Sequence, residues 1–108
     1  MKLLDFIPYL LAPQKLAEYY RQIGIREHSV APTIYMRKAL NASSDIAVFE
    51  LEETDDDIHF TKNGVDYIQL TAVDQAIEFI ADEFAAKRNA VPHEEIASRL
   101  MEYAIYDA

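Results

Sequence analysis

The N-terminal part of the chain has apolar residues at helical spacing. Asp5 as an N-cap predicts a short helix over residues 6–11, which Pro13 ends. An apolar stripe spaced i, i+4, i+7 predicts a second helix over residues 14–23, and Gly24 is placed to end it. The first quarter of the chain is therefore predicted to be a helical hairpin.

The C-terminal part has the same helical periodicity. Thr71 and the aspartate three residues later resemble a capping box. An apolar stripe spaced i, i+4, i+7, i+11 then predicts a helix over residues 72–88. Pro92 predicts the start of a last helix. In this helix, Glu95 and Arg99 are spaced for a favourable ion pair.

The middle of the chain has the pattern of β-strands. Residues 46–51 and 65–70 are rich in strand-forming side chains, and residues 58–60 put two apolar side chains on one face. The Asn-Gly pair at 63–64 is a strong signal for a type I′ hairpin turn, because that turn needs positive φ at both central residues. Residues 33–38 fit a strand nearly as well as a short helix. We expect three antiparallel strands in meander order, with residues 33–38 as the candidate fourth.

These elements predict an α+β fold in a single domain over residues 1–108. It has an N-terminal helical hairpin, a three- to four-stranded antiparallel meander, and two C-terminal helices packed on one face of the sheet. A chain of 108 residues that is 51% hydrophobic has enough apolar side chains for a core. No apolar run reaches the roughly 20 residues of a membrane span. Asp5 and Pro8 interrupt the N-terminal apolar stretch, so we expect no signal peptide and a cytoplasmic location.

The charge is distributed unevenly along the chain. Residues 1–44 carry six basic and three acidic side chains, a net charge of +3, whereas residues 45–108 carry four basic and sixteen acidic ones, a net charge of −12. This balance makes direct nucleic-acid binding and adhesion to anionic membranes unexpected. The densest cluster places six carboxylates in eight positions: Glu50, Glu52, Glu53, Asp55, Asp56 and Asp57.

Three interpretations of this cluster stay open. It is a solvated edge strand and turn, whose charges prevent pairing between sheets, or it binds a basic protein surface, or it binds a cation. On a strand, Glu50 and Glu52 would share one face about 7 Å apart, and aspartates 55–57 would form a turn. A calcium loop is disfavoured, because Phe60 stands where such a loop needs glycine.

Candidate catalytic groups are few. The chain has no Cys, so a thiolate nucleophile and a thiolate-ligated metal are excluded. His28, His59 and His93 lack metal-ligand spacing, and no nucleophile elbow or phosphate-binding loop is present. Alternation on a strand would put Asp57 and His59 on the same face. These two residues are the candidate catalytic pair. We therefore expect neither an enzyme nor a bound metal or cofactor.

The functional prediction is a small acidic protein-binding module. The leading form is an inhibitor of the immunity-protein or antitoxin type, which would occlude a basic partner such as a nuclease toxin with its acidic strand and turn. One alternative is a structural or chaperone-like subunit that forms homo-oligomers through apolar residues of the N-terminal helices. These residues are Leu3, Leu4, Phe6, Leu10 and Leu11. Another is a hydrolase that uses His59 with neighbouring carboxylates.

Overall fold

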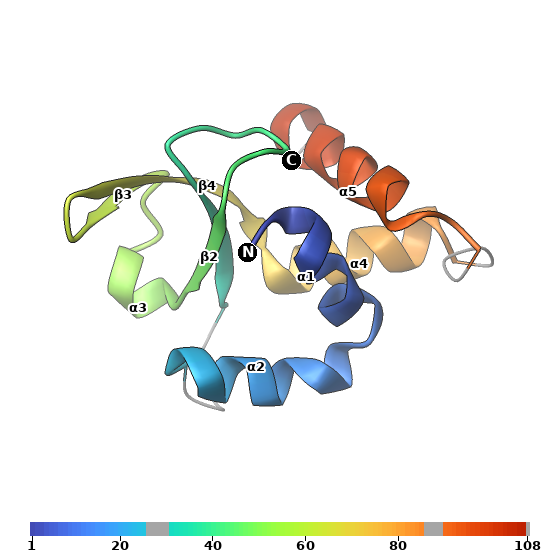
Figure 1. Ribbon diagram of the computed structural model, residues 1–108, viewed down its shortest axis with the longest axis horizontal. Helices are drawn as coiled ribbons and strands as arrows, with labels where there is room; N and C mark the ends of the chain where they lie inside the picture. Colours follow the sequence, from blue (N-terminus) through green and yellow to red (C-terminus); the bar gives the residue numbers. More distant parts are fainter. Residues whose placement is uncertain (26–30, 86–89, 108) are drawn as a thin grey trace.

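A computed structural model gives the fold of residues 1–25, 31–85 and 90–107 (Figure 1). Its elements in chain order are α1 (Leu3–Leu11), the 3₁₀ turn η1 (Pro13–Lys15), α2 (Leu16–Ile23), β1 (Thr33–Arg37), β2 (Ile46–Phe49), α3 (Leu51–Thr54), β3 (His59–Lys62), β4 (Val65–Ala72), α4 (Val73–Glu83), α5 (His93–Glu102) and the π-helical turn η2 (Tyr103–Asp107). The predicted α+β class is confirmed, with its helical hairpin, antiparallel sheet and two C-terminal helices. Among the described residues, no helix is long and apolar enough to cross a membrane.

The N-terminal hairpin begins earlier than the sequence predicts. The helix starts at Leu3, so Asp5 lies in its first turn and is not the N-cap. From there the Asp5 carboxylate reaches back and accepts the backbone N–H of Lys2 at 3.0 Å. That contact satisfies a backbone donor near the start of the helix. Gly24 ends the second helix at φ 83°, as predicted, because glycine adopts this left-handed conformation without strain.

The four strands form one antiparallel sheet in the order β2-β1-β4-β3. Residues 33–37 are a strand and take a central place, which resolves the ambiguity of the sequence. The predicted meander order is wrong, because the strand at residues 46–49 pairs with β1 and lies at the edge opposite β3. The sheet therefore consists of two hairpins, β1–β2 and β3–β4, which are joined through β1 and β4. In the second hairpin, Asn63 and Gly64 have φ values of 53° and 79°, as a type I′ turn requires.

This strand order determines the path of the chain between the two hairpins. Residues 50–58 connect β2 at one edge of the sheet to β3 at the opposite edge. They reach it across one face of the sheet, and α3 lies on this side (Figure 1). The helices α1, α4 and α5 lie on the other side. One face of the sheet is therefore covered by this connection and the short helix α3, and the other face by the three longer helices.

The face toward the helices forms the main core. Alternate residues of β1 and β2, such as Ile34, Met36 and Val48, pack there with buried side chains of the helices. Phe6 from α1 and Ile96 from α5 are fully buried in the same cluster. Complete burial of side chains of this size stabilises the fold by about 1.5–3 kcal/mol each.

The opposite face carries a smaller aromatic cluster. Tyr35, Phe49, Phe60 and Tyr67 come from all four strands, and the ring centroids of Phe49 lie 5.6, 5.2 and 5.1 Å from those of the other three. Tyr35 has no exposed surface and Phe49 is 8% exposed. Aromatic pairs at these separations contribute about 0.5–1.5 kcal/mol beyond the area they bury.

The C-terminal helices differ from the prediction in their ends. The first spans Val73–Glu83, shorter than the predicted 72–88, whose last three residues lie outside the described part of the chain. Its N-cap is Ala72, without a side-chain cap, so the capping box expected at Thr71 is wrong. Arg99 pairs with Glu83 at the end of α4, which links the two helices to each other.

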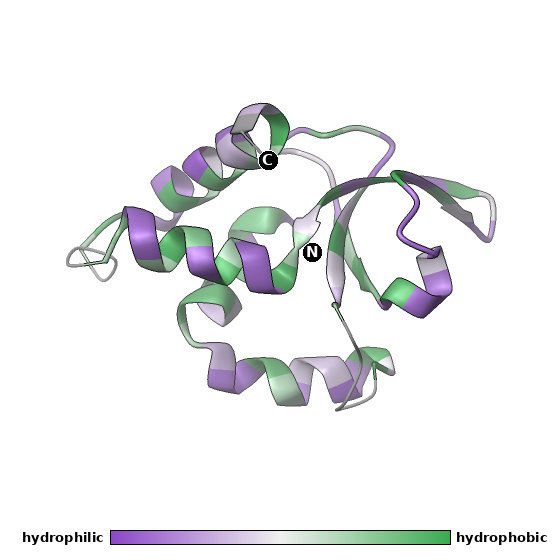
Figure 2. Ribbon diagram, turned by 180° about the vertical axis from the view of Figure 1, so that it is seen from behind, coloured by the Kyte–Doolittle hydropathy of each residue, from purple (hydrophilic) through white to green (hydrophobic). Residues whose placement is uncertain are grey.

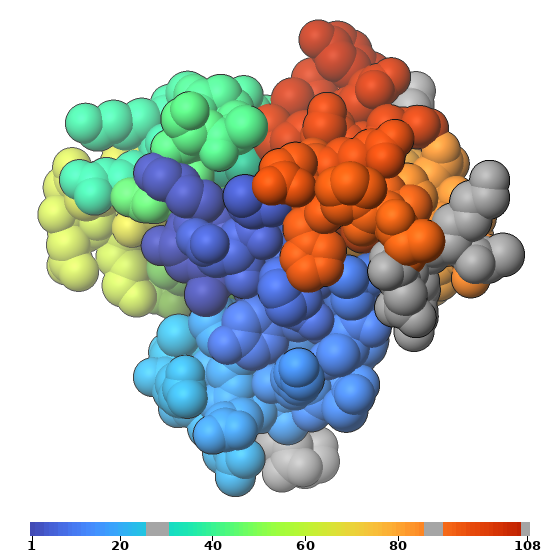
Figure 3. Space-filling view, turned by 45° about the vertical axis from the view of Figure 1, so that its right-hand side comes forward, coloured from blue at the N-terminus to red at the C-terminus, as the bar shows by residue number. Residues whose placement is uncertain are grey.

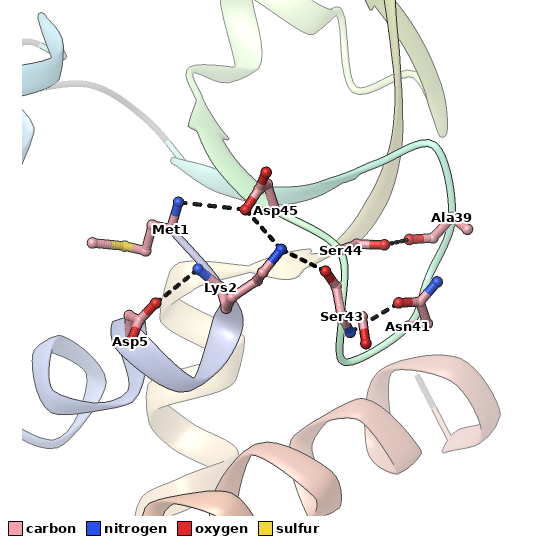
Figure 4. A network of polar contacts seen from close by, with 8 residues as sticks. All are labelled: Met1, Lys2, Asp5, Ala39, Asn41, Ser43, Ser44 and Asp45. Carbon is pink, nitrogen blue, oxygen red and sulfur yellow. Dashed lines mark hydrogen bonds and ion pairs between the residues drawn. The ribbon is translucent and has the colours of Figure 1, made fainter.

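The N-terminus is tied to the loop between β1 and β2 (Figure 4). Lys2 forms an antiparallel bridge with Asp45, and the carbonyl of Met1 accepts the backbone N–H of Ile46 at 2.7 Å. The Lys2 ammonium lies 3.1 Å from the Asp45 carboxylate and donates to the carbonyl of Ser43 at 2.6 Å. These contacts cover the outer side of the β2 edge where that strand begins.

Candidate functional site

The six predicted carboxylates lie on the connection that crosses the sheet, which we call the acidic segment (residues 50–57). The strand at 46–49 ends before Glu50, and Glu52 and Glu53 lie in the first turn of α3. The expected strand face shared by Glu50 and Glu52 is therefore wrong. Asp55 and Asp56 end the helical turn, both with left-handed backbone conformations (φ 56° and 58°).

The acidic segment is fixed to the sheet by neutral side chains. The hydroxyl of Tyr35 in β1 donates to the carbonyl of Asp57 at 2.5 Å. The side-chain amide of Gln69 in β4 donates to the Asp56 carboxylate at 2.9 Å. Within the segment, the buried Thr54 accepts the backbone N–H of Asp56 at 3.2 Å. The segment is therefore held over both central strands and not only at its ends.

The Glu53 carboxylate of the segment forms an ion pair with a lysine of the sheet. The ammonium of Lys62 in β3 bonds to Glu53 and lies 5.4 Å from the centre of the Phe49 ring. Both charged side chains are partly exposed, at 44% and 36%, so the ion pair contributes at most about 1 kcal/mol. Lys62 therefore offsets one of the six negative charges.

Most carboxylates of the segment lie at the protein surface. Glu52, Asp55, Asp56 and Asp57 are exposed, whereas Glu50 is half-buried. In the described residues, the carboxylates of Asp55 and Asp57 have no hydrogen-bond or ion-pair partner. Figure 2 shows the chain around α3 as a largely hydrophilic stretch beside the sheet. The structure thus presents an acidic surface on a well-anchored support.

A cleft of about 560 Å³ lies where the acidic segment meets the end of β4. Asp56 lines it, together with Gln69 and Thr71 of β4 and Gln75 of α4. The hydroxyl of Thr71 donates to the side-chain carbonyl of Gln75 at 3.3 Å. Ile58, which is 62% exposed, lies at the same cleft. This volume is in the range of small-ligand pockets.

The predicted Asp57–His59 pair does not share a strand face. The third strand begins at His59, and Asp57 belongs to the preceding connection. His59 is exposed, and His93 is the exposed first residue of α5. His28 lies outside the described residues. Within residues 1–25, 31–85 and 90–107, no group of three or more His, Asp or Glu side chains is placed to hold a metal ion.

The apolar N-terminal residues are mostly used inside the fold. Leu3, Phe6 and Leu10 are buried, Leu11 is half-buried, and Leu4 is 39% exposed. Figure 3 shows the start of the chain against α5, which supplies part of this contact. The apolar surplus that suggested self-association therefore goes largely into the core.

The N-terminal tyrosines form a second aromatic group. Tyr9 and Tyr19 contact the Phe6 ring, with centroid separations of 5.7 and 5.4 Å. Burial, with smaller contributions from the charges of Asp74 and Tyr19, raises the pKa of Tyr20 to about 12. Tyr20 and Asp74 also line a cleft of about 500 Å³ between α2 and α4.

Sequence reasoning missed the residues that organise the acidic segment. Tyr35 and Gln69 are paired neighbours in the sheet, Tyr35↔Gln69, on the face that the segment crosses. The available signal was a glutamine on the same strand face as Tyr67, where an apolar residue would be expected. Using that signal required the strand order, which places β1 beside β4.

Comparison of the chain with protein-family models, curated proteins and solved structures finds no match.

Proposed function

We propose that this chain is a protein-binding module that docks onto a basic partner protein through the acidic segment. One observation carries the proposal: the segment is bonded to both central strands, while Asp55 and Asp57 keep exposed carboxylates without a partner in the described residues. A backbone segment that is already held in place loses little conformational entropy on binding.

The repulsion among the carboxylates of the acidic segment costs folding free energy, which suggests that the charge has a function. Carboxylates at neighbouring positions repel one another, and a cationic surface removes that cost. Asp55 and Asp56 also adopt left-handed backbone conformations, where asparagine would serve without any charge and would keep a side-chain oxygen for the Gln69 hydrogen bond at residue 56. Fold stability alone therefore does not account for aspartate at these positions.

Among proteins that bind basic partners, an inhibitor of the immunity-protein or antitoxin type fits the segment best. A nuclease has a cationic site built to hold phosphate groups, and carboxylates on a firm support would occupy that site in their place. The chain's net charge of −9 would speed the encounter by electrostatic steering. Inhibition would require no chemistry from the inhibitor, only occlusion of the site.

The test is capture of the partner from the native host with a C-terminal tag, which leaves the paired N-terminus intact. The acidic-segment variant combines Asp57→Lys with Asp55→Asn, because asparagine tolerates the left-handed conformation at residue 55. A basic protein, identified by mass spectrometry, should be retained by the wild type and lost by this variant. Retention should also fall as the salt concentration rises.

The matched control makes the same change in charge on α4, by Asp82→Lys with Glu78→Gln, two exposed positions. It should retain the partner as the wild type does. Equal retention by all three proteins, or retention that salt does not change, would refute docking through the acidic segment.

A further inference from the structure

We infer that the cleft beside Asp56 binds the guanidinium group of an arginine side chain on the basic partner. This inference rests on the proposed function and adds to it a specific anchoring residue. The surrounding carboxylates would attract any cationic surface, whereas the cleft would recognise one side chain of that surface.

The charge of the cleft suits a cation. Its lining includes the Asp56 carboxylate and no lysine or arginine from the described residues. The residues on either side of Asp56 in the chain, Asp55 and Asp57, carry two more exposed carboxylates. The Lys62 ammonium is bonded to Glu53 and does not line the cleft. A cationic group would therefore enter without displacing a cation of the protein.

The polar groups of the cleft leave several oxygen atoms for an incoming donor. Asp56 uses Oδ1 to accept from the Gln69 amide, and no contact in the described residues involves Oδ2. Gln69 acts there through its nitrogen, which leaves its side-chain carbonyl as an acceptor. The side-chain carbonyl of Gln75 accepts one hydrogen bond from Thr71 and has a second lone pair. The acceptors come from three elements: the acidic segment, β4 and α4.

This distribution of acceptors favours arginine over lysine. A guanidinium group has five N–H donors in one plane and reaches several separated oxygens, whereas an ammonium group is a compact point charge. The cleft also has apolar walls from Leu51, Ile58 and Ala104. The three methylenes of an arginine side chain would pack against these walls. Ile58, exposed at 62%, would become covered in the complex.

The probe is blocked arginine, Nα-acetyl-arginine methylamide, added to the full chain while amide NMR spectra are recorded. Blocked citrulline has nearly the same shape without the charge, and blocked lysine has the charge without the planar fork. We expect binding in the millimolar range for arginine, with the largest shifts at the side-chain amides of Gln69 and Gln75. Citrulline should bind at least about tenfold more weakly, which is the loss of one charge-assisted hydrogen bond.

The decisive variant is Asp56→Asn. Asparagine tolerates φ 58° and keeps a side-chain oxygen for the Gln69 hydrogen bond, so the variant removes charge with little change of shape. It should weaken arginine binding by about tenfold. The control is Asp82→Asn, which removes one exposed carboxylate from α4, away from the cleft, and should change the affinity less than about twofold.

The outcomes separate this inference from the proposed function, because the probe needs no partner protein. No shift at the cleft, equal binding of citrulline or lysine, or equal weakening by Asp56→Asn and Asp82→Asn would each overturn the arginine site. The capture experiment with the Asp55 and Asp57 variant would still test docking through the acidic segment independently. Arginine-selective shifts that Asp56→Asn removes, with Asp82→Asn unaffected, would support the site.

Discussion

Replacing Tyr35 by phenylalanine tests whether one buried hydroxyl holds the acidic segment on the sheet. The change removes the donor of the 2.5 Å hydrogen bond to the carbonyl of Asp57 and keeps the ring among its aromatic neighbours. A hydrogen bond of this kind contributes about 0.5–1.5 kcal/mol net. The long contact from the Gln69 amide to the same hydroxyl, 3.5 Å, adds little, and Gln69 keeps its bond to Asp56. We therefore expect a loss of about 1 kcal/mol in the free energy of unfolding.

Urea denaturation measures the loss in the free energy of unfolding of Tyr35→Phe. Thermal melting should show a Tm lower by about 4–8 °C for a domain of this size. Amide hydrogen exchange is the more specific measurement, since residues 51–58 should exchange faster while the helices keep their protection. Tyr67→Phe is the control, because its ring lies in the same cluster and its hydroxyl has no hydrogen bond in the described residues. A Tyr35→Phe protein with unchanged exchange in residues 51–58 would refute the anchoring role.

Three further predictions concern the β3–β4 turn, the N-terminus and the half-buried Tyr20. Gly64→Ala should destabilise the fold by about 1–2 kcal/mol in urea denaturation, through backbone strain at φ 79° and not through a clash, because the site is open. The hydrogen bond and charge of Lys2, with the charge of the N-terminal ammonium, lower the pKa of Asp45. This carboxylate therefore stabilises the fold above its unfolded-state pKa, and the contribution is lost as the pH falls through the folded-state pKa. Acid unfolding of Asp45→Asn should lack that part of the pH dependence. In an alkaline absorbance titration, Tyr20 should ionise at a pH of about 12, and Asp74→Asn should lower this pKa while leaving it above the ordinary value, because burial is its main cause.

Most helices and the second hairpin were predictable because each depends on local signals. The helical stripes, Gly24 and the Asn-Gly turn act within a few residues of the chain, and the structure confirms them. The strand order was not predictable in this way, because the pairing of β1 with β4 joins residues far apart in sequence. The ambiguous residues 33–37 proved to be a central strand, buried on both faces, whose sequence therefore lacks clear alternation.

The position of the acidic cluster on the chain was visible in the sequence, but its support was not. Prediction extended the strand at 46–49 into Glu50 and Glu52, where the chain turns into α3. The turn expected at 55–57 is present as two aspartates with positive φ. The hydrogen bonds from Tyr35 and Gln69 depend on the crossing connection, and so do the walls of the cleft. No local pattern encodes a contact that depends on strand order.

The crossing connection also bears on how the protein reaches its folded state. Each hairpin closes over a short stretch of chain, whereas β1 and β4 must meet across an intervening stretch that contains residues 50–58. Contacts distant in sequence carry the larger entropic cost and are slow to form. Until these two strands pair, the sheet beneath residues 50–57 is incomplete. The connection that carries the carboxylates is then not held by both Tyr35 of β1 and Gln69 of β4. A partner that recognises the native arrangement of these carboxylates would therefore bind the folded chain and not the unfolded one.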